Sequence, residues 1–314
     1  MVNRVTVDYL RLSITNRCNL NCLYCRPRPA KLFSPAAILS DEEIIKIVKL
    51  LVVNGIRKVR ITGGEPLLKE GVADLVGRLS NIRELEEISM TTNGTFLKKW
   101  AGTLKRAGLG RINLSLDTLR KPRYTDITGQ DRFNDVWEGI EEALGVGLWP
   151  VKLNVVVMKN INDDEVLDFI ELACRKKIIV RFIELFSTHR ENYQAPDYFI
   201  PNSSVRKKIE TAFGCLEEAA GIKGGGPAQY FKVKQSSGIV GFIDTVTSEF
   251  CQRCSRIRMS CDGKLYQCLF SSKYLDLSKF AASPEFIQRF IAGKRYHTKN
   301  TVKPHPFEMS LRGG

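Results

Sequence analysis

Three cysteines lie close together near the start of the chain, in the run Cys18-Asn19-Leu20-Asn21-Cys22-Leu23-Tyr24-Cys25. Their spacing, C-x3-C-x2-C, places three thiols on one short loop directly after a strand-like stretch. Three thiolates can bind three irons of a four-iron cluster and leave the fourth iron without a protein ligand. A structural zinc site usually has four protein ligands, and this loop carries no histidine and no fourth cysteine. The spacing therefore predicts a cluster with one open iron, against the alternative of three unrelated loop cysteines.

A second set of cysteines lies far along the chain, where Cys251 and Cys254 form a C-x2-C pair and Cys268 follows. Residues 256–260 and 264–267 are typical of two short strands around a turn. An antiparallel hairpin of that length returns Cys268 to the side of Cys254, so the three thiols converge. The pattern predicts a second metal site.

Cys261, in the turn of this hairpin, leaves one alternative open. A zinc ion bound by four cysteines would take Cys261 as its fourth ligand. At the tip of the hairpin, however, Cys261 is expected several residues from the point where Cys254 and Cys268 meet. We therefore favour three cysteine ligands with Cys261 outside the site.

Arg256 and Arg258 are two positions apart on the first strand of the hairpin, so their side chains face the same side. Two guanidiniums beside a metal site repel one another unless an anion lies between them, and their planar donors suit phosphate oxygens. The pair predicts a phosphate-binding site. Two arginines that face solvent are the alternative.

The composition also favours an anionic partner. The 314 residues include 48 Lys and Arg against 34 Asp and Glu, a formal net charge of +14. No segment interleaves basic with aromatic residues, as a surface for single-stranded nucleic acid does. We therefore expect a polyphosphate substrate and no nucleic-acid partner.

Cysteine usage and hydropathy predict the compartment. Seven of the nine cysteines, Cys261 included, fall within residues 18–25 and 251–268, which indicates metal-binding thiolates in a reducing compartment rather than disulfides. Cys174 and Cys215 are expected to be buried apolar residues. No apolar run is long enough to span a membrane, and the chain begins without a signal-peptide pattern. A cytoplasmic protein without membrane contact is expected.

Strand-like and helix-like patterns alternate through the first 185 residues. Six βα units in sequence imply a parallel sheet with right-handed crossovers, and barrel-type α/β folds place their chemistry at the C-terminal ends of such strands. The expected fold is an α/β partial barrel of the (β/α)6 type. Its strands are expected at residues 9–15, 58–62, 87–92, 111–117, 151–158 and 178–185. Its helices are expected at about 70–80, 97–106, 133–146 and 163–175, and after the capping-box sequence Ser40-Asp41-Glu42-Glu43.

Beyond residue 186 this alternation stops, which predicts two domains, residues 1–186 for the barrel and residues 187–314 for a smaller α+β region. The glycine-rich run Gly224-Gly225-Gly226-Pro227 is expected to be a plain loop, because no helix follows it to complete a phosphate site. In the second domain we expect hairpins over 230–242 and 256–268 and helices near 205–213 and 284–292.

The first cysteine loop, with Tyr24 before its last cysteine, resembles the signature of the radical S-adenosylmethionine (SAM) superfamily. From about Tyr9 to the last residue, the chain is similar to the GTP 3′,8-cyclase family of that superfamily. The resemblance implies a partial barrel of the radical SAM type whose C-terminal region carries a second cluster. The motifs that carry it are, in order, Gly63-Gly64-Glu65-Pro66, Thr91-Thr92-Asn93-Gly94, Ser115-Leu116-Asp117, Ile127-Thr128-Gly129-Gln130, Arg181-Phe182-Ile183-Glu184-Leu185, the C-x2-C-x-R-x-R hairpin and a terminal Gly313-Gly314.

Two [4Fe–4S] clusters and SAM are the cofactors that the resemblance implies. The first cluster would be bound by Cys18, Cys22 and Cys25, and the second by Cys251, Cys254 and Cys268. The residues that would contact SAM are Tyr24, Gly64, Ser115 and Phe186. Those that would contact GTP are Arg11, Arg60, Thr91, Lys152, Arg256, Ile257 and Arg258.

The implied activity is that of a lyase in the first step of molybdenum cofactor biosynthesis. Reductive cleavage of SAM gives a 5′-deoxyadenosyl radical, which takes a hydrogen from the 3′ carbon of GTP. The resulting carbon radical attacks carbon 8 of guanine, and one-electron reduction of the cyclised radical, with uptake of a proton, yields 3′,8-cyclo-7,8-dihydro-GTP. The Gly313-Gly314 tail would reach into the active site. The implied partners are a flavodoxin- or ferredoxin-like reductant and a downstream cyclic pyranopterin monophosphate synthase. Whether the chain forms a homodimer is left open.

Three positions depart from the family's usual residues. Phe186 stands where methionine is common, Cys261 where a small residue is usual, and Arg26 where methionine or leucine is common. None removes a cluster ligand, and a contact of Phe186 with SAM through its backbone would be unaffected.

Two other functions stay open. A radical SAM enzyme that acts on a peptide or an RNA would usually carry more auxiliary cysteines than three. A non-enzymatic nucleic-acid binder with a cluster or a zinc ion would suit the net charge of +14. It would leave Gly63-Gly64-Glu65 and the open-iron spacing unexplained.

Overall fold

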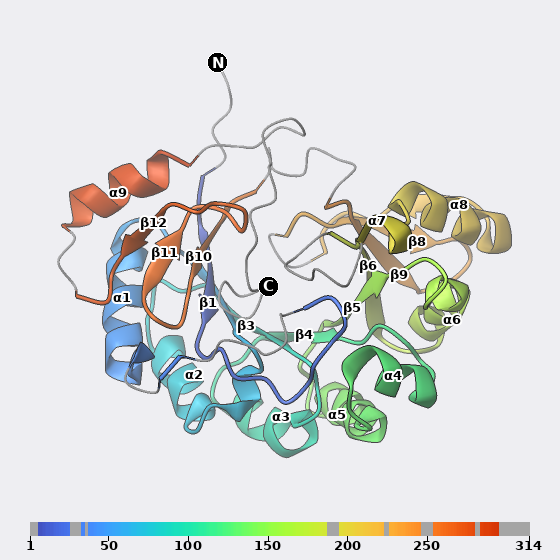
Figure 1. Cartoon of the computed structure of the whole chain (residues 1–314), viewed down its shortest axis with the longest axis horizontal. Coiled ribbons are helices and arrows are strands. Elements are labelled where there is room, and N and C mark those ends of the chain that lie inside the picture. Colours follow the sequence, from blue (N-terminus) through green and yellow to red (C-terminus); the bar gives the residue numbers. More distant parts are fainter. Residues whose placement is uncertain are drawn as a thin grey trace.

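The computed structural model of the chain describes residues 6–25, 33–34, 37–186, 195–222, 226–245, 254–279 and 283–294. Figure 1 shows a curved sheet with helices packed along its outer, convex face. Several positions singled out in the sequence lie outside the described residues: Cys251, Arg26, Gly224, Gly225 and the Gly313-Gly314 tail.

One sheet of twelve strands organises the described chain, in the spatial order β12-β11-β10-β1-β2-β3-β4-β5-β6-β9-β8-β7. The six expected strands, β1 to β6, are confirmed, and neighbours among them pair in parallel. The strands are β1 (Tyr9–Ser13), β2 (Lys58–Thr62), β3 (Glu87–Thr92), β4 (Arg111–Ser115), β5 (Val151–Val157), β6 (Ile178–Glu184), β7 (Leu216–Glu218), β8 (Gln229–Val233), β9 (Ile239–Ile243), β10 (Arg256–Met259), β11 (Lys264–Tyr266) and β12 (Tyr274–Asp276).

The helices that follow the parallel strands lie on the outer face of the sheet (Figure 1). Among the described residues, no helix is long and apolar enough to cross a membrane. The helices are α1 (Asp41–Val53), α2 (Val72–Ser80), α3 (Leu97–Arg106), α4 (Lys121–Thr128), α5 (Phe133–Gly145), α6 (Val166–Arg175), α7 (Ala195–Tyr198), α8 (Asn202–Phe213) and α9 (Pro284–Ala292), with 3-10 turns η2 (Pro66–Leu68) and η3 (Asp163–Glu165).

One helix was not predicted, and one expectation about burial is wrong. Helix α4 was not expected, because Tyr124 and Ile127 alone give no apolar periodicity over its eight residues. Its end is marked instead by Gly129, which has a left-handed φ of 71°. Cys215, expected to be buried, is exposed. It precedes Leu216, which begins the edge strand β7 and takes the inward position.

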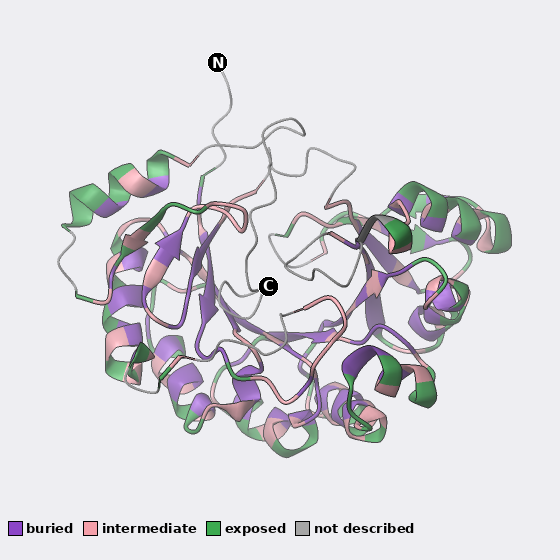
Figure 2. Ribbon diagram, viewed as in Figure 1, coloured by how far each residue is buried: buried purple, intermediate pink, exposed green. Residues whose placement is uncertain are grey.

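Alternation along the strands gives the sheet two buried faces of different chemistry. Apolar side chains such as Leu12, Ile61 and Met90 belong to the hydrophobic core. The strand sequence of β1 is buried at every position, and Figure 2 shows the same along the central strands, whereas the outer sides of the helices are exposed. The concave face is therefore buried as well, but it carries polar residues. They include Arg11, Arg60, Ser89, Asn113, Lys152 and Arg181.

The C-terminal strands continue the sheet at both edges. β10 pairs in parallel with β1 and places Arg258 opposite Arg11, and β9 pairs in parallel with β6 and places Gly241 opposite Arg181. The two expected hairpins are confirmed as β8–β9 and β10–β11. The sheet thus runs across the domain boundary predicted near residue 186.

The start of α1 shows how the local sequence determines a helix. Ser40 Oγ accepts a hydrogen bond from the backbone N–H of Glu43 at 3.3 Å, and the Glu43 carboxylate accepts from the backbone N–H of Ser40 at 2.7 Å. This is the expected capping box. Ile44, Ile47 and Leu51 then recur at helical spacing and are buried.

Ser40→Ala should lower the free energy of unfolding by about 1 kcal/mol, because it removes the side chain that caps α1. Urea unfolding followed by circular dichroism measures the change. Ser203→Ala, in the exposed first turn of α8 where no side chain caps the helix, is the matched control and should change the value by less than ~0.5 kcal/mol. Equal losses in both variants would contradict the role of the cap.

Candidate active site

A cavity of about 270 Å³ lies on the concave face of the sheet. Its walls come from the first cysteine loop, from the C-terminal ends of the parallel strands and from the hairpin β10–β11. The predicted site residues that line it are Arg11, Cys18, Cys22, Tyr24, Cys25, Arg60, Gly64, Thr91, Ser115, Phe186, Cys254, Arg256, Arg258 and Cys268.

Two predicted GTP contacts are not part of this lining. Ile257 alternates with its two arginine neighbours and packs in the hydrophobic core, so only its backbone is available to a substrate. Lys152 is fully buried in β5 beneath the cavity wall. The third predicted ligand of the second cluster, Cys251, lies outside the described residues.

Backbone hydrogen bonds to the end of α4 hold the first cysteine loop in place. The backbone N–H groups of Asn21 and Leu23 donate to the carbonyls of Thr128 and Ile127 at 2.8 and 3.0 Å. The Tyr24 hydroxyl donates to the Asp117 carboxylate at 2.6 Å. The loop is therefore attached to the end of β4 and to the Ile127-Thr128-Gly129-Gln130 motif.

The donors of this loop fit an iron–sulfur cluster. Burial raises the pKa of the Cys22 thiol well above its ordinary value, and Cys25, Asp117 and Cys18 raise it further. The three half-buried cysteines line the same cavity, and three thiolates on one short loop are unfavourable unless metal cations neutralise them. A cluster that takes three thiolates and leaves one position for a small ligand satisfies this requirement.

Gly64 explains why the Gly-Gly-Glu motif needs glycine. Its backbone N–H donates to the Thr15 carbonyl at 2.8 Å, and the Glu65 N–H donates to the Arg17 carbonyl at 2.7 Å. A Cβ atom at Gly64 would lie 2.1 Å from the carbonyl oxygen of Arg17, so a side chain would push the cysteine loop away. The missing side chain lets β2 and the loop meet at the cavity.

Glu65 connects the same turn to the end of β3. The buried carboxylate accepts hydrogen bonds from Thr92 Oγ1 at 2.6 Å and from the Asn93 N–H at 2.7 Å. Burial raises the pKa of Glu65 to about 7. Asn93 Nδ2 in turn donates to Asn19 Oδ1 at 2.9 Å and lies 3.9 Å from Cys18 Sγ. The network orients the loop that carries the cysteines.

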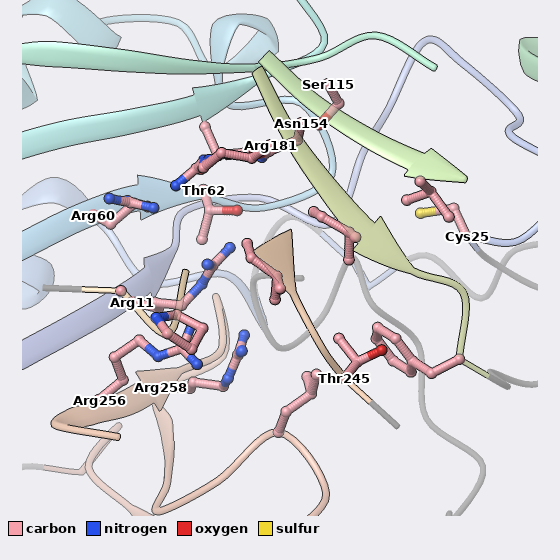
Figure 3. A pocket seen from close by; sticks show the side chains of 18 of the residues that line it. Arg11, Cys25, Arg60, Thr62, Ser115, Asn154, Arg181, Thr245, Arg256 and Arg258 are labelled. Carbon is pink, nitrogen blue, oxygen red and sulfur yellow. The ribbon is translucent and has the colours of Figure 1, made fainter. Parts of the chain in front are cut away.

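Four guanidiniums form what we call the arginine cluster: Arg11, Arg60, Arg256 and Arg258. Burial lowers the pKa of Arg11 well below its ordinary value, and Arg258, Arg60 and Arg256 lower it further. Figure 3 shows Arg11, Arg256 and Arg258 gathered together, with Cys25 on the other side of the cavity. Like charges at this density call for an anion between them.

The second cysteine set lies next to the arginine cluster. Burial would raise the pKa of Cys254, but the charges of Arg256 and Lys294 outweigh burial and lower it to about 6. Lys294 Nζ lies 3.4 Å from Cys254 Sγ. The thiolate form that a metal requires is therefore favoured at Cys254.

Cys261 lies apart from these thiols. It is buried at the turn of the hairpin and is not part of the cavity lining, and burial raises its pKa to about 12. This arrangement supports a site in which Cys261 is not a ligand.

Several residues that line the cavity were not predicted as site residues from the sequence. Arg181 and Asn154 are hydrogen-bonded to each other and line the cavity wall, and Figure 3 shows Arg181 close to Arg60 of the arginine cluster. Lys294 follows α9 and reaches the second cysteine set. Arg181 could have been singled out from the sequence, because it is a basic residue among the apolar residues of strand β6. Lys294 had no such signal, since only tertiary packing brings the end of α9 to the cavity.

The protonated, charged form of Lys152 is unfavourable in the folded state. Burial lowers its pKa to about 6, and the charges of Arg181, Arg111 and Arg60 contribute. Between pH 6 and an ordinary lysine pKa of about 10.4, the unfolded chain therefore holds a proton that the folded chain lacks. This difference makes the free energy of unfolding rise with pH in that interval.

Lys152→Met should remove this rise. The wild-type protein should gain stability relative to the variant between pH 7 and pH 9, by at most about 1.4 kcal/mol per pH unit. Urea unfolding at pH 7, 8 and 9 measures the difference. Lys159→Met, at an exposed lysine, should keep the wild-type pH dependence. Parallel curves for wild type and Lys152→Met would show that Lys152 keeps its proton on folding.

Two family models match the chain. The model described as Radical SAM superfamily matches residues 12–173, and the model described as Molybdenum Cofactor Synthesis C matches residues 178–304. Together they cover both halves of the sheet and its C-terminal extensions.

Proteins named GTP 3′,8-cyclase are similar to this chain over most of its length. The protein of Thermodesulfovibrio yellowstonii is 45% identical over 298 residues, which cover 93% of this chain and 92% of the relative. That of Alkaliphilus metalliredigens is 44% identical over 311 residues, covering 98% and 96%. That of Listeria monocytogenes is 38% identical over 310 residues, covering 97% and 90%.

Solved structures of lower identity share the fold. Streptococcus suis SuiB bound to S-adenosylmethionine superposes with a TM-score of 0.66 at 14% identity, covering 91% of this chain and 68% of that chain. The structure of anSMEcpe with bound AdoMet gives a TM-score of 0.51 at 22% identity, covering 65% and 57%. The expected partial barrel is confirmed.

Proposed function

Because the chain belongs to the GTP 3′,8-cyclase family of the radical SAM superfamily, we propose that its cavity binds SAM beside the first cysteine loop and GTP beside the arginine cluster. The family's reaction is a lyase reaction that converts GTP to 3′,8-cyclo-7,8-dihydro-GTP in the first step of molybdenum cofactor biosynthesis. One observation supports placing GTP and SAM at opposite ends of the cavity. The arginine cluster requires a polyanion, and it lies across the cavity from Cys25 of the first cysteine loop.

The first cysteine loop is the proposed site of the catalytic cluster. When bound by Cys18, Cys22 and Cys25, an iron–sulfur cluster supplies the electron that cleaves SAM into methionine and a 5′-deoxyadenosyl radical. The residues proposed to contact SAM line the same end of the cavity: Tyr24, Gly64, Ser115 and Phe186. Gly64 keeps the loop close to β2, and Phe186 packs edge-on against Phe270 at 5.9 Å. These apolar rings are suited to exclude water from the reaction.

Cys251, Cys254 and Cys268 are proposed to bind a second cluster. Cys254 and Cys268 line the cavity, and the lowered pKa of Cys254 favours the thiolate form. Arg256 and Lys294 beside these thiols would stabilise the negative charge of a thiolate-bound cluster. A zinc ion is the alternative, and the metal content separates the two.

GTP is proposed to place its triphosphate among the arginine cluster. Guanidiniums bind phosphate oxygens through paired donors, and binding would relieve the repulsion that lowers the pKa of Arg11. Thr91 Oγ1 and Arg181 Nε are buried without a hydrogen-bond partner in the described structure and offer further polar contacts. The reaction would also need an external one-electron donor of the flavodoxin or ferredoxin type. A further enzyme would consume the cyclised nucleotide.

The metal content tests the proposal of two clusters. Anaerobic reconstitution should give about eight irons per chain. Cys261→Ser should retain all of them, because Cys261 lies outside the cavity lining, whereas Cys254→Ser should retain about half. Four irons with one zinc in the wild-type protein, or loss of metal on Cys261→Ser, would overturn the assignment.

The reaction itself is tested with SAM, dithionite and each of the four nucleoside triphosphates under anaerobic conditions. GTP alone should give a new product together with 5′-deoxyadenosine. The product is an isomer of GTP, so chromatography must precede mass analysis. Product from a peptide or RNA in place of GTP would favour the other radical SAM functions.

Arg258→Ala should weaken GTP binding by about 10- to 150-fold, because it removes charge-assisted hydrogen bonds worth roughly 1.5–3 kcal/mol. Isothermal titration calorimetry measures the dissociation constant. SAM affinity should stay at the wild-type value, and the loss should be smaller for guanosine, which has no phosphates. Arg83→Ala, at an exposed arginine of the loop after α2, is the matched control. Wild-type GTP affinity in Arg258→Ala would place the triphosphate elsewhere.

A further inference from the structure

Tyr230, on the C-terminal strand β8, contacts a buried lysine of the barrel. Lys152 Nζ donates a hydrogen bond to the Tyr230 hydroxyl oxygen at 2.9 Å. The same nitrogen lies 4.7 Å from the centroid of the tyrosine ring. Tyr230 itself is not part of the cavity lining, but its register with Gly241 and Arg181 places its side chain on the same, concave face of the sheet.

A glycine makes this contact possible. Across the sheet, Arg181 of β6 stands opposite Gly241 of β9, and Gly241 stands opposite Tyr230 of β8. A Cβ atom at Gly241 would lie 3.0 Å from ring carbons of Tyr230 and 3.1 Å from Cγ of Arg181. The side chains of Tyr230 and Arg181 therefore meet over the backbone of Gly241, where a larger residue would separate them.

Arg181 contacts Tyr230 and also lines the cavity. Its side chain lines the cavity wall and is hydrogen-bonded to Asn154. Burial lowers the pKa of Arg181, and Tyr230 is the strongest of the influences that oppose burial. Tyr230 is thus the polar neighbour that a buried lysine and a buried arginine share, and it comes from a strand outside the parallel core.

We propose that Tyr230 is a positioning residue of the nucleotide site: packed over Gly241, it holds Lys152 and Arg181 in the arrangement that accepts GTP. The inference rests on the proposed function, since it assumes that GTP binds at this wall. It adds a residue that neither the sequence motifs nor the cavity lining singled out. It also gives the C-terminal hairpin β8–β9 a role in the active site.

Tyr230→Phe tests the role of the hydroxyl group, because the ring and its packing over Gly241 are retained. The dissociation constant of GTP, measured by calorimetry on the reconstituted enzyme, should rise about 3- to 10-fold, the effect of one lost hydrogen bond. The melting temperature and the affinity for SAM should stay at wild-type values. A residue with a purely structural role would change the melting temperature and both affinities together.

Gly241→Ala provides a second test, since the added methyl group would lie 3.0 Å from the Tyr230 ring and 3.1 Å from Cγ of Arg181, so these side chains must shift by a few tenths of an ångström. It should weaken GTP binding at least as much as Tyr230→Phe does and leave SAM affinity unchanged. Tyr274→Phe, which removes a hydroxyl from a half-exposed tyrosine of β12, is the matched control and should bind GTP as wild type does.

Different results would contradict the role of Tyr230 and the binding of GTP. Wild-type GTP affinity in both Tyr230→Phe and Gly241→Ala, alongside weakened binding in Arg258→Ala, would overturn the role of Tyr230 and leave the GTP site standing. Absence of GTP binding by the wild-type enzyme would overturn the proposed function itself.

Discussion

The repulsion among buried guanidiniums is the constraint on which the rest of the structure depends. Arg11 and Arg258 stand opposite each other on adjacent parallel strands, and Arg60 and Arg256 are close enough to lower the pKa of Arg11 further. Burying several like charges opposes folding. The sheet can accept this cost because its other face packs a large continuous hydrophobic core against the outer helices. The concave face is thereby available for binding an anion.

At the opposite end of the cavity, the constraint is the close approach of backbones. The Gly63-Gly64 turn lies so near the cysteine loop that no side chain fits at Gly64. Glu65 extends this contact to Thr92 and Asn93, and Asn93 returns to the loop. The position of the three thiols is therefore set by strand ends from β2 and β3, rather than by the loop alone.

Much of this could be predicted from the sequence, for physical reasons that differ between residues. The capping box at Ser40 and the apolar spacing of α1 are local, so they appear directly in the sequence. The strands β1 to β6 were visible because apolar residues alternate or run together in them. α4 was missed because Tyr124 and Ile127 are its only large apolar residues, which is too few to show a helical period, although both are buried in the folded chain. The GTP contacts of Lys152 and Ile257 stay predictions. Neither residue lines the cavity, because Lys152 is fully buried on the concave face and the side chain of Ile257 packs in the core.

The sequence by itself determined which chemistry is available: the cysteine spacings, the glycine of the Gly-Gly-Glu turn and the paired arginines of the hairpin are short-range patterns whose meaning does not depend on the rest of the chain. Only the tertiary structure decided where that chemistry meets. β10 pairs with β1 although some 250 residues separate them, and α9 brings Lys294 to Cys254. Tyr230 reaches Lys152 across Gly241. Such contacts depend on sheet order and register, which arise from the packing of the whole chain and leave no pattern in any one segment.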